Sequence, residues 1–139
     1  LMPWEWPPEK IYQEYLFHGA DLQVVKQLLG VSDEGCRGVL QIPNVVDIPW
    51  WRIALLDGGL QMALLWERKR SGLPSLPTGF GRLHWYKYVS SQEPVTCELI
   101  LQSATQLAAT WSIVFTNAAE EIIATMEDVK IHVLPQPAT

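Results

Sequence analysis

The stretch IALLDGGLQMALLW, residues 53–66, decides the fold of this 139-residue chain. Every position in it is apolar or glycine except Asp57 and Gln61. A helix that is apolar on all sides is normally buried, and this stretch is shorter than the roughly 20 residues that a membrane span requires. It therefore predicts a helix at the centre of a globular domain.

Asp57 and Gln61 are four residues apart, so a carboxylate and an amide would project together from one side of this helix. Burial disfavours the charged form of a carboxylate and raises its pKa, which is what a general acid needs at neutral pH. A second interpretation is that Asp57 caps or bonds neighbouring backbone groups. The spacing alone leaves both interpretations open.

The composition bounds the class of protein. Hydrophobic residues make up 48% and charged residues 18%, which is typical of one globular domain with a core. A net charge of -5 argues against a nucleic-acid partner, and no stretch is long enough to enter a membrane. The basic cluster at residues 68–70 suits the end of the central helix. Cys36 and Cys97 are too few for a disulfide framework or a metal site, and with no visible signal peptide we expect a cytoplasmic protein.

The rest of the chain predicts three regions and several strands. Residues 1–10 form a Pro/Trp-rich lead-in, residues 11–134 one domain, and residues 135–139 a tail; because the chain opens on Leu1, we expect it to be part of something longer. Apolar residues alternate with polar ones in the second half, most clearly from Leu107 to Phe115, which indicates strands with one covered face. Short breaks between them favour antiparallel neighbours. The predicted strands are residues 22–29, 35–42, 80–89, 95–102, 107–116 and 122–133. This pattern gives the α+β class.

Three motifs resemble one family. The segment LLDGGLQ (residues 55–61) is similar to the LLDxxLQ/H motif in the C-terminal half of dehydratase domains of polyketide synthases and of related polyunsaturated fatty acid megasynthases. The segment LFHGADLQ (residues 16–23) resembles the aromatic/His-Gly-Pro-x-Phe-Gln stretch that opens that half. The segment LPTGFGRLH (residues 76–84) is similar to the Leu-Pro and strand after the helix. The three occur in the family's order between residues 11 and 134.

The resemblance implies a single hot-dog fold, an antiparallel sheet wrapped around a central apolar helix. It implies dehydration of a β-hydroxyacyl chain carried on the phosphopantetheine arm of an acyl carrier protein, with no other cofactor and a second hot-dog as partner. Asp57 would protonate the departing hydroxyl and Gln61 would orient it. The substrate-binding positions implied are His18, Gly19, Gly58 and Pro77. Close packing against the sheet is the alternative for Gly58 and Gly59, and the favoured one.

The chain also departs from the family. None of His18, His84 and His132 lies in the HxxxGxxxxP motif that carries the family's base, and Ala20 and Leu22 stand where Pro and Phe are usual. We interpret His18 as a structural hydrogen-bonding residue and expect the other two histidines at the surface. We therefore expect no dehydration by the isolated chain.

Two functions of different classes remain open. The chain is either the C-terminal half of an active dehydratase whose base comes from elsewhere, or a noncatalytic module that binds an acyl chain or holds a megasynthase dimer together. A thioesterase or isomerase use of the same fold is a third option. In each case we expect pairing through an exposed edge strand or helix face.

Overall fold

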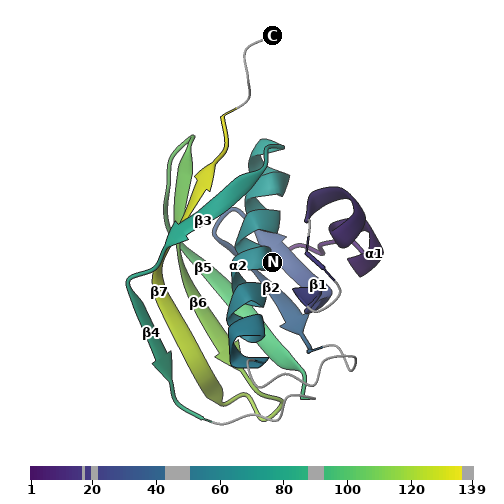
Figure 1. The fold of residues 1–139 in the computed structure, drawn as a ribbon, viewed down its shortest axis with the longest axis vertical. Helices are drawn as coiled ribbons and strands as arrows, with labels where there is room; N and C mark the ends of the chain where they lie inside the picture. Colours follow the sequence, from purple (N-terminus) through teal and green to yellow (C-terminus); the bar gives the residue numbers. More distant parts are fainter. Residues whose placement is uncertain (17, 20–21, 43–50, 88–92, 136–139) are drawn as a thin grey trace.

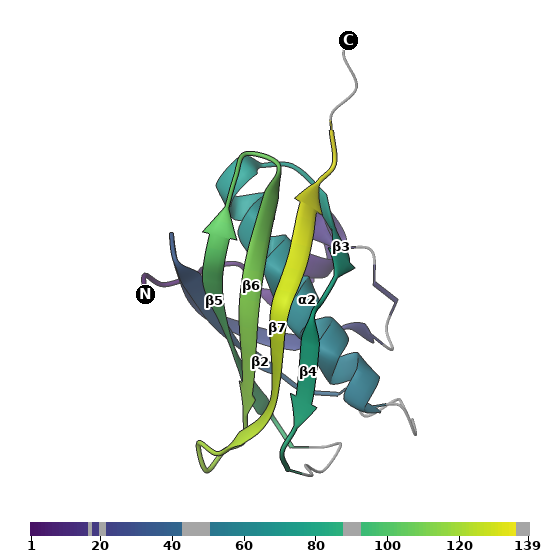
Figure 2. The same cartoon turned by 90° about the vertical axis from the view of Figure 1, so that its left-hand side faces the viewer.

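The computed structural model describes residues 1–16, 18–19, 22–42, 51–87 and 93–135. A seven-stranded antiparallel sheet curls around one long helix, α2 (Trp51–Ser71), which lies along the concave face (Figures 1 and 2). This is a single hot-dog of the α+β class, as predicted. The remaining elements are α1 (Pro8–Lys10), the π-helical turn η1 (Ile11–Tyr15), β1 (Val25–Ser32), β2 (Gly35–Leu40), β3 (Ser75–Gly79), β4 (Arg82–Trp85), β5 (Val95–Ala104), β6 (Ala108–Thr116) and β7 (Ile122–Val133).

Helix α2 extends beyond residues 53–66 at both ends, and it ends at Ser71, directly after the basic cluster at residues 68–70 that was expected at its end. Gly72, with φ of 75°, follows its last residue, and its N–H donates to the carbonyl of Arg68 at 2.8 Å. A glycine in this left-handed conformation is the usual end of a helix because it has no Cβ to clash. After the helix, residues 75–79 form strand β3, which was not among the predicted strands.

The strand order is β1-β2-β5-β6-β7-β3, and β4 also pairs with β7. Along β6, Ala109, Trp111, Ile113 and Phe115 are all buried against the helix, which confirms the predicted alternation. The prediction is wrong for Leu107, which precedes the strand and is 66% exposed. The predicted strand at residues 80–89 is shorter, Arg82–Trp85, and the first predicted strand begins later, at Val25.

The two edges of the sheet differ. At β1, Met2 and Val31 exchange two backbone hydrogen bonds of 2.9 and 2.8 Å, so the lead-in lies against this edge. Trp4 of the lead-in is buried, so this segment packs onto the domain. At the other edge, β3 and β4 pair with β7 on one side only, so far as the described strands extend.

An ion pair with one buried partner, the carboxylate of Glu67, lies near the end of α2. Glu67 has no exposed surface, and its carboxylate accepts hydrogen bonds of 2.8 and 2.6 Å from Nε and Nη2 of Arg70. The Arg70 guanidinium also lies over the Trp66 ring, 5.1 Å from its centroid. Trp66 in turn meets Trp111 of β6 edge to face. Within the basic cluster at residues 68–70, Arg70 therefore forms an ion pair and a cation–π contact in addition to its interaction with the helix dipole.

Some predictions lie outside the described residues. They concern Ala20, the proline-containing loop at residues 43–50, part of the break at residues 90–93 and most of the tail at residues 135–139. No helix in the described part of the chain is long and apolar enough to cross a membrane.

Candidate functional site

Asp57 and Gln61 project from the same side of α2, as predicted. The Gln61 Nε2 donates hydrogen bonds of 2.7 Å both to Oδ2 of Asp57 and to the carbonyl oxygen of Leu22. Gln61 is fully buried, whereas 29% of the Asp57 side chain is exposed. The amide thus belongs to the interior, and the carboxylate lies where the interior meets solvent.

His18 joins this pair from the segment before β1. Its Nε2 lies 3.3 Å from Oδ2 of Asp57, and 21% of its side chain is exposed. The backbone of His18 is held by Gln23, whose Nε2 donates to the His18 carbonyl at 3.0 Å. The Nδ1 of His18 is enclosed and finds no hydrogen-bond partner among the described residues. The interpretation of His18 as a hydrogen-bonding residue therefore gains a specific partner, the candidate catalytic carboxylate.

The expected rise in the pKa of Asp57 is wrong. Burial is the largest single influence and raises the pKa, but hydrogen bonds from His18 and Gln61 and the charge of His18 together lower it below its usual value. Groups that donate to a carboxylate favour its ionised form. The prediction from the sequence considered burial alone and did not include the hydrogen bond from His18, which is 39 residues before Asp57 in the chain.

Tyr12 is a part of the site that the sequence did not indicate. Its hydroxyl donates to Oε1 of Gln61 at 2.7 Å and accepts a hydrogen bond of 2.8 Å from the N–H of Val25. Burial raises the pKa of this hydroxyl, so it stays protonated. The available signal was a tyrosine in an apolar segment, because a buried Tyr hydroxyl needs a polar partner.

The glycines of α2 are explained by packing. A Cβ on Gly58 would lie 2.6 Å from Cγ2 of Val24, and one on Gly59 would lie 2.8 Å from the Phe115 ring. The close-packing interpretation is therefore confirmed at both positions. A substrate-binding role of Gly58 stays a prediction.

The other two predicted substrate-binding positions, Gly19 and Pro77, lie on different segments. Gly19 follows His18 and is exposed, with open space where a Cβ would lie. Pro77 lies in edge strand β3 opposite Ile131 of β7, and it makes no hydrogen bond with the site in the described structure. The structure thus brings Asp57, Gln61 and His18 together, and a substrate-binding role of Gly19 and Pro77 stays a prediction.

His84 and His132 lie on exposed strand positions, as predicted. His84 Nδ1 is 3.2 Å from the Tyr86 hydroxyl, and His132 Nδ1 is 2.8 Å from the Thr78 hydroxyl. Neither contacts Asp57 within the described residues.

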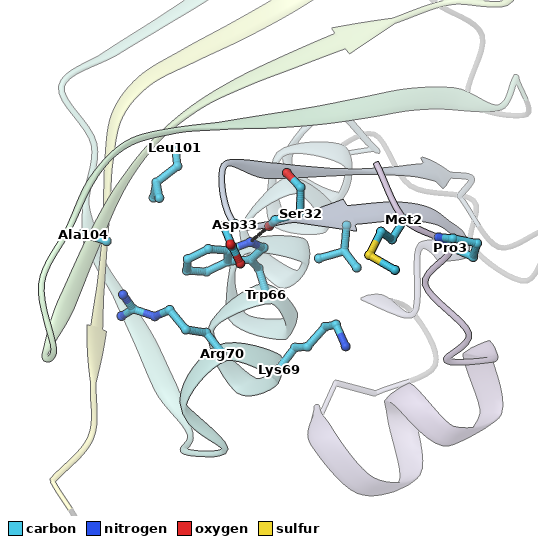
Figure 3. A pocket seen from close by; sticks show the side chains of 10 residues that line it. Met2, Pro3, Ser32, Asp33, Trp66, Lys69, Arg70, Leu101 and Ala104 are labelled. Atoms are coloured by element: carbon cyan, nitrogen blue, oxygen red, sulfur yellow. Dashed lines mark hydrogen bonds between the residues drawn. The ribbon is translucent and has the colours of Figure 1, made fainter.

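A cavity of about 580 Å³ opens between the second half of α2, the β1–β2 hairpin, β5 and the lead-in at Met2 and Pro3 (Figure 3). Trp66 forms part of its wall, with its Nε1 bonded to the carbonyl of Ser32 at 2.9 Å. Trp66 is about 13 Å along the helix from Asp57, at a rise of about 1.5 Å per residue. This cavity therefore belongs to a different region from the carboxylate.

Metal binding and cysteine reactivity are two further kinds of chemistry that side chains can provide. In the part of the chain that the structure describes, no three His, Cys, Asp or Glu side chains gather as metal ligands would. Cys36 and Cys97 are free and buried, and burial raises the pKa of both thiols. Such thiols are poor nucleophiles, because the thiolate is the reactive form.

The fold and the helix-borne carboxylate define the chain as a hot-dog domain, and solved structures of this fold resemble it. A trans-AT PKS dehydratase domain from Brevibacillus brevis superimposes with a TM-score of 0.77 at 20% identity, over 94% of this chain and 48% of that one. The dehydratase domain of PpsC from Mycobacterium tuberculosis, in complex with C12:1-CoA, gives 0.71 at 18% identity, over 93% and 52%. The E. coli PaaI protein from the phenylacetic acid degradation operon gives 0.65 at 8% identity, over 81% of both chains.

These likenesses establish the hot-dog fold. The chain spans about half the length of the two dehydratase domains. No protein-family model matches the chain, and a search of curated proteins finds no significant match.

Proposed function

We propose that this chain is the acid-bearing C-terminal half of a dehydratase domain in polyketide or fatty acid biosynthesis. Its substrate is a β-hydroxyacyl thioester on the phosphopantetheine arm of an acyl carrier protein. A base removes the α-proton, the bond between Cβ and the hydroxyl breaks, and the hydroxyl takes a proton from Asp57 and leaves as water. The product is the α,β-unsaturated thioester.

The observation that carries this proposal is the Asp57–Gln61 pair. A carboxylate 29% exposed and held by a fully buried amide has a fixed direction and remains within reach of a ligand. A positioned acid contributes because water is a far better leaving group than hydroxide. The similarity to dehydratase domains supports the same reaction class.

Asp57 must acquire a proton before it can act as the acid. The contact with His18 favours the ionised form at present, and burial favours the protonated form. A substrate hydroxyl that takes the place of His18 Nε2 removes one of the two donors and also excludes water. Both changes raise the pKa of the carboxylate toward the range in which it can donate.

The base comes from a second hot-dog in this proposal. His18 is the described histidine nearest the acid, but its Nε2 faces Asp57 and its Nδ1 is enclosed. A second domain fits the β3–β4 edge, where Leu76, Phe80 and Tyr86 are each more than half exposed. Exposed apolar residues beside an open strand are typical of a protein interface.

A noncatalytic module is the second candidate. The ionised state of Asp57 favours it, because a carboxylate without its proton cannot act as the acid. In that role the hot-dog would bind an acyl chain or join two halves of a megasynthase without reacting.

The test compares the isolated chain with the chain joined to its native flanking sequence. Each is incubated with a 3-hydroxyacyl pantetheine thioester, and the loss of water is followed by mass spectrometry. We expect no turnover by the isolated chain, and turnover by the longer protein that is lost in Asp57→Asn. Turnover that is equal in Asp57→Asn would refute the acid role, and an inactive longer protein that still binds the thioester would establish the noncatalytic module.

A further inference from the structure

The hydroxyl of Tyr12 connects three elements of the fold. It lies on η1, donates to Oε1 of Gln61 on α2 and accepts from the N–H of Val25 on β1. A backbone N–H can only donate, so it occupies a lone pair of the hydroxyl. The single proton of Tyr12 is therefore available to Gln61.

The same contacts determine which way the Gln61 amide points. The oxygen and nitrogen of an amide have nearly the same shape, so their hydrogen-bond partners decide the orientation. The Tyr12 proton requires the amide oxygen, and the Leu22 carbonyl, 2.7 Å from Nε2, requires the amide nitrogen. Gln61 is fully buried, so water cannot replace either partner.

This orientation turns a donor toward Asp57. With Nε2 bonded to Leu22, the other N–H of the amide points at Oδ2 of Asp57, 2.7 Å away. A reversed amide would place its oxygen against two acceptors, the Leu22 carbonyl and the carboxylate. That arrangement is unfavourable, and protonation of Asp57 would relieve only the contact with the carboxylate.

We propose that Tyr12 is a positioning residue of the Asp57 site: by bonding the oxygen of Gln61 it keeps the amide N–H directed at the carboxylate and so favours the ionised form. The inference rests on the proposed function only in treating Asp57 as the reacting carboxylate. Within the described residues, the titratable groups facing Asp57 are His18 and Tyr12. The Tyr12 hydroxyl stays neutral, so its influence passes through Gln61.

The test is a titration of the Asp57 carboxyl carbon by NMR in a double-mutant cycle. The variants are Tyr12→Phe, Gln61→Leu and the double variant, each in the full chain. We expect the titration midpoint of Asp57 to move upward in Y12F and in Q61L, and Y12F to add no further shift once Gln61 is Leu. An unchanged midpoint in Y12F, or an equal shift by Y12F in both backgrounds, would overturn the proposal.

Tyr15→Phe is the matched control. Tyr15 lies on the same turn, its ring stacks on Trp6, and no hydrogen bond of its hydroxyl is found among the described residues. Removal of the Tyr15 hydroxyl should leave the titration midpoint of Asp57 unchanged. If Tyr12 had a purely structural role, Y12F would change the thermal stability without moving that midpoint.

The unmodified chain offers a second measurement should Y12F fail to fold. Both Nε2 protons of Gln61 should exchange slowly with water, because each is bonded and buried; rapid exchange would contradict a fixed amide. These measurements use no substrate. A dehydration assay that fails while the midpoint moves as expected therefore refutes the proposed function and leaves the role of Tyr12 intact.

Discussion

Arg70→Met should destabilise the fold strongly, because it leaves the carboxylate of Glu67 buried without its partner. Glu67 is completely enclosed and receives two hydrogen bonds from Arg70, whose side chain is 29% exposed. Breaking a buried ion pair costs about 3–5 kcal/mol, and partial access of solvent to Arg70 places this case near the lower limit. Loss of the guanidinium over Trp66 adds about 0.5–1 kcal/mol. We expect a total of about 3–4 kcal/mol, or a fall in Tm of roughly 10 °C.

Urea unfolding followed by circular dichroism measures this loss. Lys69→Met is the control: it removes a neighbouring cation that forms no ion pair within the described residues, so it should cost less than about 1 kcal/mol. The double variant Glu67→Met/Arg70→Met should recover most of the stability, because no uncompensated charge remains. A loss below about 1 kcal/mol in R70M, or a double variant as unstable as R70M, would refute the assignment of a buried, strongly coupled pair.

Three further outcomes are expected. His18→Phe should raise the pKa of Asp57. A folded-state pKa below the unfolded value of 3.8 stabilises the fold above that value, and this stability is lost as the pH falls toward the folded-state pKa, so H18F should lose less stability in acid than the original protein. Equal losses of stability in thermal melts of both proteins at acid pH would contradict this. Gly58→Ala should destabilise by about 1 kcal/mol in urea unfolding, because the overlap with the Val24 side chain outweighs the helical gain of about 1 kcal/mol. A stabilised variant would show that Val24 moves aside easily. Leu76→Asp should weaken self-association in sedimentation experiments, and equal association would exclude the β3–β4 edge as the interface.

Local patterns in the sequence account for much of the fold. The uniform apolar character of residues 53–66 identified the central helix, and alternation predicted β7 with its observed limits, residues 122–133. Such periodicity reports which face of an element is covered. It could not give the start of β1, because Val25 is bonded through its N–H to the Tyr12 hydroxyl, a contact between segments that no local pattern records.

The candidate site was predicted only in part. The spacing of Asp57 and Gln61 placed both on one side of α2, and the motif containing His18 placed it near them. The protonation of Asp57 could not be predicted, since it depends on the direction of the Gln61 amide and on the distance from His18 Nε2. Both are set by how η1 and β1 pack on the helix, which is a property of the whole fold.

The bridge between Met2 and Val31 bears on the size of any assembly. A sheet with two free borders can add neighbours without limit, as fibres do. Here the lead-in lies against one border, and Pro3 next to the bridge has no N–H to offer an incoming strand. A sheet that can add a neighbour at one border only would form a closed pair rather than a polymer.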